Sequence, residues 1–288
     1  MAWKFAGTRV RPGREISGVC RPKMDETYQK GSHRVVLVHG ITGSSRFFRW
    51  LEDRLHPGPV KAETLSFDLM GFGANKDVKS DYSAAQQLRF MTDRIEERFP
   101  SGKLVLIGHS LGGVLALAWT VEHLSRVSHL ILLNTPLGKS REDIVHSLGH
   151  GPLSWATLLL RQKPLAHLTH LACVLMRIPG VERAFRFLKP SYVPDEVFED
   201  YVRHSWRSLK ATFDQILLNV PGVRLVRQIH SIPILNLMGQ KDDEISRRTI
   251  DQANVENAVM PGGHLMLLEH PLETSQAIER FLTREIPA

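Results

Sequence analysis

One serine lies between two glycines in the segment GHSLG at 108–112. The short apolar run Leu104–Ile107 precedes this segment, and an alanine- and leucine-rich stretch through about His123 follows it. A strand, a G-x-S-x-G turn and a helix in this order are typical of a nucleophile elbow. There, a strained turn presents the serine oxygen while helix amides point toward developing negative charge. The pattern predicts that Ser110 is a nucleophile.

A serine hydroxyl attacks poorly until a histidine, oriented by a carboxylate, accepts its proton. The segment PGGH at 261–264 places His264 on a glycine-rich loop near the end of the sequence. Between the serine and this histidine, the acids Asp242, Asp243 and Glu244 follow the apolar run Ile232–Met238. The chain order serine, acid, histidine matches one known arrangement of such sites. The adjacent acids leave the choice between Asp242 and Asp243 open.

Short apolar runs, several of them β-branched, alternate with segments of helical periodicity. Such runs are typical of strands buried on both faces of a parallel sheet. The predicted strands are Arg34–Val38, Ala62–Phe67, Leu104–Ile107, Leu130–Leu133, Ile232–Met238 and Glu256–Met260, and predicted helices cover 83–99, 111–123 and 273–284. The sequence therefore predicts an α/β fold with a mostly parallel β-sheet flanked by helices.

The alternation stops between Asn134 and Ile232. That stretch contains apolar residues at helical spacing, interrupted by prolines. We expect residues 1–136 and 232–288 to form one core, and 137–231 to form a helical lid inserted over the carboxyl ends of the strands, close to Ser110. The leucines of the insertion and Trp155 would then line an apolar pocket.

These motifs resemble the α/β-hydrolase superfamily over Arg34–Asn134 and Ile232–Arg284. The resemblance implies a serine carboxylesterase-like site with Ser110, Asp242 and His264. Asp242 is favoured because relatives usually place the acid three residues after a glycine, here Gly239.

The loops around these residues extend the resemblance. The segment HGI at 39–41 is similar to the superfamily's oxyanion loop, which implies the backbone N–H groups of Ile41 and Leu111 as oxyanion donors. The DLMGFG segment at 68–73 also matches a superfamily loop, with Asn75 where serine is common.

Four side chains are candidates for contacts with substrate: His39, Thr42, Trp155 and Leu265. Instead of contacting substrate, His39 could hydrogen-bond the backbone of its own loop, and the same structural role is open to His109. Histidine pairs at helical spacing, His146 with His150 and His167 with His170, are expected on polar helix faces rather than in a metal site. We predict no cofactor and no metal.

The formal charge of +7 and the isoelectric point near 9.6 do not indicate nucleic-acid binding, because no basic recognition module is evident. Residues 137–231 contain 13 Lys or Arg against 8 Asp or Glu, a net charge of +5. No apolar run is long enough to span a membrane, and Met1–Val10 lacks the apolar core of a secretory signal. We expect a soluble, cytoplasmic protein. Cys20 and Cys173 are too few for a disulfide framework.

Hydrolysis of carboxylic esters of small to medium apolar substrates, through an acyl-enzyme intermediate, is the first functional hypothesis. A thioesterase or ester hydrolase that acts on an acyl group held by an acidic carrier protein is the second, motivated by the positive charge of 137–231. A ligand-binding or receptor-like homologue with a vestigial triad is a third hypothesis. A lyase with the same three residues is a fourth. A serine nucleophile argues against the relatives that open epoxides or alkyl halides with an aspartate.

Overall fold

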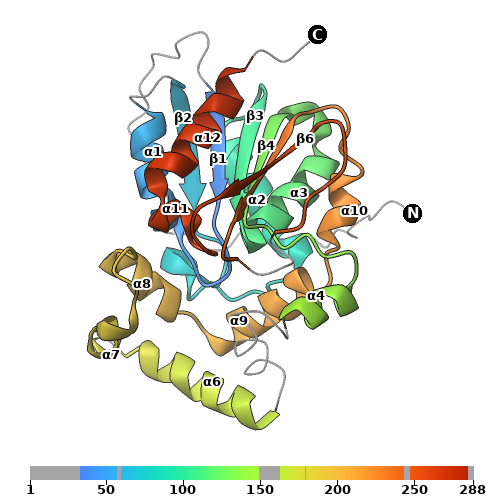
Figure 1. Cartoon of the computed structure of the whole chain (residues 1–288). Helices are drawn as coiled ribbons and strands as arrows, with labels where there is room; N and C mark the ends of the chain where they lie inside the picture. The colour runs from blue at the N-terminus through green and yellow to red at the C-terminus, as the bar shows by residue number, and fades with distance from the viewer. Residues whose placement is uncertain (1–32, 57–59, 149–162, 179, 243–246, 285–288) are drawn as a thin grey trace.

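Six parallel strands form the central sheet, in the order β2-β1-β3-β4-β5-β6 (Figure 1). The computed structural model describes residues 33–56, 60–148, 163–178, 180–242 and 247–284. The strands are β1 (His33–Val38), β2 (Ala62–Phe67), β3 (Leu104–His109), β4 (Val127–Leu133), β5 (Ile234–Gly239) and β6 (Val255–Met260). The predicted α/β fold with a mostly parallel sheet is therefore confirmed.

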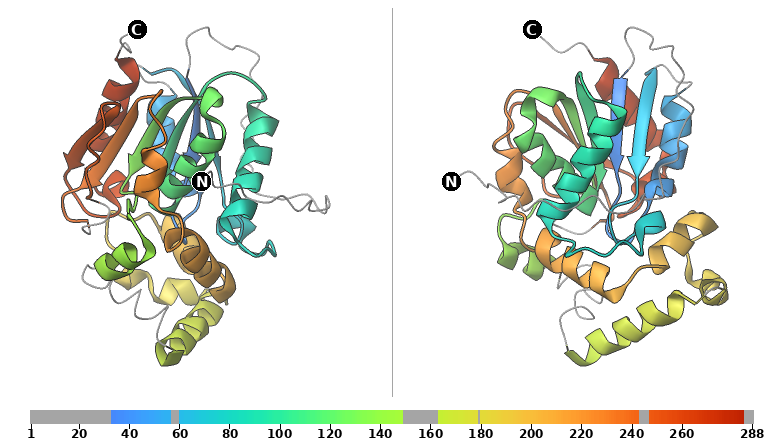
Figure 2. Two further views of the ribbon diagram at one scale, coloured as in Figure 1. Left: turned by 90° about the vertical axis from the view of Figure 1, so that its right-hand side faces the viewer. Right: turned by 180° about the vertical axis from the view of Figure 1, so that it is seen from behind.

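Helices cover both faces of the sheet (Figure 2). They are α1 (Arg49–Leu55) and α12 (Pro271–Thr283) on one face, and α2 (Ala84–Arg98) and α3 (Leu111–Glu122) on the other. Alternate strand residues point to opposite faces. Val36 and Leu106 pack in the cluster with α2 and α3, whereas Val35 and Ile107 pack in the cluster with α1 and α12. Burial on both faces explains the apolar runs of the inner strands, such as Val35–Val38 in β1 and Leu104–Ile107 in β3.

The strand register aligns the carboxyl ends that hold the predicted site residues. His109 pairs with Leu133, and Gly239 pairs with Met260. The segments that follow β3, β4, β5 and β6 therefore leave the sheet at the same edge, where open α/β sheets bind ligands.

Between β4 and β5, the described residues form helices and no strand. These helices are α4 (Arg141–Leu148), α6 (Lys163–Met176), α7 (Val181–Ala184), α8 (Asp195–Val202), α9 (Trp206–Thr212), a π-helix at Phe213–Leu217 and α10 (Gly222–Val226). Helices α6 to α9 lie beyond the carboxyl ends of the strands (Figure 1). In contrast, Phe213, Ile216 and Val226 pack in the same cluster as α3. The boundaries of a separate lid at 137 and 231 stay a prediction.

Several element boundaries differ from the sequence predictions. β4 begins at Val127, three residues before the expected start, because its ladder with β3 continues past Ser128 and His129, which the apolar pattern does not include. The last helix begins at Pro271, since proline is well suited to a first helical position. Among the described residues, no helix has both the length and the apolarity that a bilayer crossing requires.

Candidate active site

Ser110 lies in a strained turn between β3 and α3. Its φ of 52° and ψ of −119° are rare for a residue with a side chain, and such backbone conformations typically cost about 1–3 kcal/mol. The backbone N–H of Ser110 donates to the carbonyl oxygen of Leu133, at 2.9 Å, which fixes the turn against β4. This is the geometry of a nucleophile elbow.

Two glycines let the turn pack closely. A Cβ atom on Gly108 would lie 2.5 Å from the carbonyl oxygen of Gly112, and a Cβ atom on Gly112 would collide with the carbonyl oxygens of Val38 and His39. The obstacles are backbone atoms that cannot rotate away. The glycines of the G-x-S-x-G pattern are therefore required by the packing of α3 against the end of β1.

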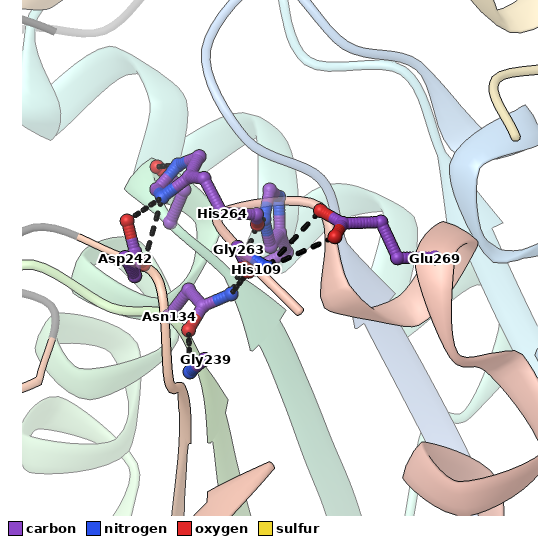
Figure 3. Close-up of polar contacts among 8 residues, drawn as sticks. His109, Asn134, Gly239, Asp242, Gly263, His264 and Glu269 are labelled. Atoms are coloured by element: carbon purple, nitrogen blue, oxygen red, sulfur yellow. Dashed lines mark hydrogen bonds and ion pairs between the residues drawn. The ribbon is translucent and has the colours of Figure 1, made fainter. Parts of the chain in front are cut away.

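Ser110, His264 and Asp242 form one hydrogen-bonded chain. The Ser110 Oγ atom lies 3.0 Å from His264 Nε2, and His264 Nδ1 lies 3.0 Å from both Asp242 Oδ1 and Asp242 Oδ2. An ionised carboxylate only accepts, so Nδ1–H donates to Asp242 and Nε2 can accept from the serine hydroxyl. Figure 3 shows Asp242 and His264 facing each other.

Burial differs along this chain of groups. The Asp242 side chain is 2% exposed, whereas the His264 side chain is 26% exposed. The carboxylate is thus screened from water while the imidazole edge stays accessible. The alternative acid, Asp243, lies outside the described residues, as does Glu244.

The loop of the predicted oxyanion donors lies beside the serine. A Cβ atom on Gly40 would be 3.1 Å from Ser110 Cβ, and the Gly43 N–H closes the loop by donating to the Gly40 carbonyl oxygen at 3.1 Å. Thr42 has a φ of 63°, so the loop contains a second strained residue. Leu111 begins α3, where backbone N–H groups lack acceptors within the helix.

His39 is fully buried and bonds to the main chain through both ring nitrogens. Its Nδ1–H donates to the Gly40 carbonyl oxygen at 2.7 Å, and the Leu69 N–H donates to its Nε2 at 2.9 Å. Burial lowers the pKa of His39, which favours this neutral ring. The structure therefore leaves no ring nitrogen of His39 for substrate, and gives it the alternative place in its own loop.

His109 points to the histidine loop. Its Nε2–H donates to the His264 carbonyl oxygen at 2.8 Å, and its ring stacks on Phe47 with a centroid distance of 4.4 Å. Burial, together with the neighbouring His264 and His39, lowers the pKa of His109 to about 3. The ring is neutral at physiological pH and keeps Nε2–H as a donor.

Asp68 ties the loop after β2 to the oxyanion loop. Its carboxylate accepts from Ser45 N–H at 2.6 Å and from Ala74 N–H at 2.7 Å. Asn75, which stands where relatives often have serine, donates from Nδ2 to the Asp68 carbonyl oxygen at 2.5 Å. The departure from the superfamily pattern therefore still supplies a hydrogen bond that holds this loop.

The remaining predicted pocket residues are only partly placed. Leu265 follows His264 and is half-buried against the cluster of α1 and α12. Thr42 is likewise half-buried. Trp155 lies outside the described residues.

Two side chains at the site were not singled out from the sequence. Asn134 bonds to backbone groups of both the acid loop and the histidine loop, and Glu269 accepts from the Gly263 N–H at 3.1 Å through each carboxylate oxygen (Figure 3). A polar residue directly after an apolar strand was the available signal for Asn134. No pattern distinguished Glu269 from an ordinary surface acid.

The profile of the Alpha/beta hydrolase family matches residues 35–277. Among curated proteins, the 1-acylglycerol-3-phosphate O-acyltransferase ABHD5 of Rattus norvegicus is 25% identical over 271 residues, which cover 86% of this chain and 76% of that protein.

Solved structures share the fold. An esterase from Exiguobacterium antarcticum aligns with a TM-score of 0.63 at 16% identity, over 88% of this chain and 94% of its own. A thermophilic esterase from Thermogutta terrifontis aligns with a TM-score of 0.63 at 21% identity, over 88% of this chain and 90% of its own. The chain belongs to the alpha/beta hydrolase family.

Proposed function

We propose that this protein is a serine hydrolase of the carboxylesterase type, with Ser110 as nucleophile, His264 as general base and Asp242 as the orienting acid. The observation that carries the proposal is the continuous hydrogen-bonded chain from the Asp242 carboxylate through His264 to Ser110 Oγ. The strained turn of Ser110 supports it, because such strain persists mostly where function uses it. A connected chain of this kind favours turnover over a vestigial site.

The reaction has two halves. Ser110 Oγ attacks the ester carbonyl carbon while its proton passes to His264 Nε2; collapse of the tetrahedral intermediate breaks the bond to the alcohol, which leaves with that proton. Water then gives its proton to His264 Nε2 and attacks the acyl-enzyme, and the acid is released as Ser110 regains a proton. In both halves Asp242 stabilises the transient imidazolium.

Negative charge on the carbonyl oxygen needs donors that are already in place. The backbone N–H groups of Ile41 and Leu111 serve this role. Two observations support the assignment: Gly40 approaches Ser110 directly, and Leu111 is the first residue of α3. The α3 dipole adds favourable positive potential at the same place.

The substrates are carboxylic esters of small to medium apolar acids or alcohols, covered by the insertion at 137–231 as a lid. Helices α6 to α9, which lie beyond the carboxyl ends of the strands, support such a cover over the site. The two structural neighbours described above are esterases, which agrees with ester hydrolysis. A cytoplasmic location is proposed with it.

Hydrolysis rates on p-nitrophenyl esters of graded acyl length test this function. Acyl-CoA thioesters are measured beside them. Acyl transfer to 1-acylglycerol 3-phosphate is measured as well, because the relative ABHD5 is named as an acyltransferase for that acceptor. We expect ester hydrolysis with a maximum at short to medium chains, abolished in Ser110→Ala. Thioester cleavage alone, or no turnover of any ester, would overturn the proposed substrate class.

A second candidate is a hydrolase for acyl groups on an acidic carrier protein. A surface hollow lined by Lys139, Arg227, Arg247, Arg248 and Asp251 favours it, although Asp143 pairs with Arg248. Within the insertion, ion pairs compensate part of the positive charge. Ion pairs engage Arg177, Arg186, Lys189, Arg203 and Lys210.

The hollow gives this second candidate a sharp test. Arg227→Glu should lower kcat/KM on a carrier-bound acyl group at low salt and leave the rate on a p-nitrophenyl ester unchanged, because electrostatic docking mainly affects association. Arg183→Glu, which reverses an exposed charge on α7, is the matched control. Equal effects of the two variants, or no carrier-bound turnover, would leave the small-ester function alone.

A further inference from the structure

The geometry points to Asn134 as the positioning residue that holds the acid loop and the histidine loop in register with the nucleophile, an inference that rests on the proposed function. Asn134 directly follows β4 and is fully buried. Its φ of 44° lies in the left-handed region, which asparagine tolerates better than most residues with side chains. The backbone turns there so that the side chain points along the carboxyl edge of the sheet toward both loops (Figure 3).

The two ends of the Asn134 amide bond to different loops. Its Nδ2 group donates to the carbonyl oxygens of Gly263 and His264, both at 2.9 Å. Its Oδ1 atom accepts from the Gly239 N–H at 2.6 Å. Both amide hydrogens and the oxygen are therefore used, and only an uncharged group with donor and acceptor ends satisfies this pattern.

Gly239 begins the turn that presents the acid. The Asp242 N–H donates to the Gly239 carbonyl oxygen at 3.1 Å, and the Lys241 N–H donates to the Gly262 carbonyl oxygen at 2.8 Å. A displacement of Gly239 therefore moves the Asp242 carboxylate as well as the loop that precedes His264. Through Gly239 and His264, one side chain sets the separation between acid and base.

The same strand end also carries the nucleophile. Leu133, the neighbour of Asn134, accepts the Ser110 N–H at 2.9 Å and is paired with His109 in the sheet. Asn134 is thus the sequence neighbour of the residue that bonds to Ser110, and its own side chain bonds directly to the acid loop and to the histidine loop.

Replacing the amide by a carboxyl group tests this role. Asn134→Asp keeps an acceptor for Gly239 but sets a second oxygen against the carbonyl oxygens of Gly263 and His264. A protonated carboxyl could still donate to one of them, whereas an ionised carboxylate would repel both. The titratable side chains of this network are Asp242, His264, His109 and Glu269.

We expect Asn134→Asp to lower kcat on a p-nitrophenyl ester by about 10- to 100-fold at pH 8, with KM changed less than about threefold, because misplacement of catalytic groups by about 1 Å can cost about 100-fold. The activity relative to the wild-type enzyme should fall as pH rises and the new carboxyl ionises. The downfield Nδ1–H signal of His264 in proton NMR should weaken in parallel.

Asn236 provides a matched control. It is fully buried in β5, and its Nδ2 group also donates to two oxygens, the Arg248 carbonyl and Asn257 Oδ1, both at 3.0 Å. Asn236→Asp places the same change in a similar environment outside the network. It should lower the free energy of unfolding but leave kcat, the relative pH profile and the His264 signal unchanged below its unfolding transition.

Covalent labelling of Ser110 by a fluorophosphonate separates this inference from the proposed function. If Ser110 of the wild-type enzyme labels and Asn134→Asp retains the wild-type kcat and pH profile, or matches Asn236→Asp, Asn134 has no positioning role and the proposed function stands. If the wild-type enzyme neither labels nor hydrolyses esters, the proposed function fails first. If Asn134→Asp does not fold, Asn134→Ser, which keeps a small hydroxyl donor and acceptor, must show the kcat loss with unchanged KM.

Discussion

The Nε2–H group of His109 donates to the main-chain carbonyl oxygen of His264, at 2.8 Å, so the residue before the nucleophile restrains the residue that would activate it. Asn134 donates to the same oxygen, which therefore has two donors from two strand ends. The elbow and the histidine loop are joined by side chains as well as by the proposed proton path. The lowered pKa of His109 keeps the ring neutral at physiological pH, in the tautomer that carries this Nε2–H donor.

His109→Leu should lower kcat by roughly fivefold, because one of the two donors to the His264 carbonyl is lost and a buried hydrogen bond of this kind is worth about 1 kcal/mol. His109→Gln, which retains an N–H donor, should recover part of the rate. Steady-state kinetics on one p-nitrophenyl ester compare the two variants. Equal loss in both would indicate that ring stacking on Phe47, rather than the hydrogen bond, supports the site.

Asp242→Asn should reduce kcat by about 10⁴-fold, since the imidazole of His264 loses the partner that orients it and stabilises its charge. Asp243→Asn is the matched control and should cost less than tenfold. The kcat values of both variants on the same ester decide the matter. The reverse ranking would transfer the acid role to Asp243.

Gly112→Ala should destabilise the fold by at least about 3 kcal/mol, because its Cβ atom would meet backbone oxygens at the end of β1 that cannot move aside. Gly180→Ala meets open space and adds only the strain of its φ of 93°, about 1 kcal/mol. Urea denaturation of both variants measures the difference. A Gly112→Ala protein as stable as Gly180→Ala would mean that α3 can shift away from β1.

The free energy of unfolding should fall as pH drops from 6.5 toward 4. Burial lowers the pKa of His109 to about 3 and the pKa of His204 to about 4, so the folded chain keeps these rings neutral while the unfolded chain protonates them near pH 6.5. Each ring then contributes up to about 1.4 kcal/mol of lost stability per pH unit.

Urea denaturation at pH 7.5, 6 and 5 measures this slope, and His204→Gln should make it shallower by one ring's share. A slope that does not change in His204→Gln would contradict the assignment for that ring.

The fold and the proposed nucleophile Ser110 could be predicted because their patterns are local, whereas Asp242 was favoured only by the resemblance to relatives. Apolar runs indicate strands buried on two faces, and the glycines of GHSLG at 108–112 indicate a turn too tightly packed for larger side chains. Asn134 was missed because its role depends on contacts with two distant loops, and Glu269 because its bond to the nearby Gly263 has no sequence pattern of its own. Asn134 bonds to Gly239 and Gly263, which lie 105 and 129 residues further along the chain. The residues next to Asn134 in sequence do not indicate these partners.

The insertion was predictable in outline only. Its helical character follows from the apolar spacing, but the pattern does not show which residues of the insertion join the core, as Phe213 and Val226 do beside α3. Apolar residues that line a pocket and those that fill a core have the same pattern in sequence. The charge of the insertion was equally ambiguous, since ion pairs such as Arg203 with Glu182 form between residues distant in sequence.

The rate at which a fluorophosphonate labels the protein, with the adduct located by mass spectrometry of peptides, tests the central claim most directly. The account predicts a single adduct on Ser110 and a labelling rate at least about 10³-fold slower in His264→Ala, since the serine then lacks the base that accepts its proton. An adduct on another residue, or equal labelling rates in the wild-type protein and His264→Ala, would contradict activation of Ser110 by His264.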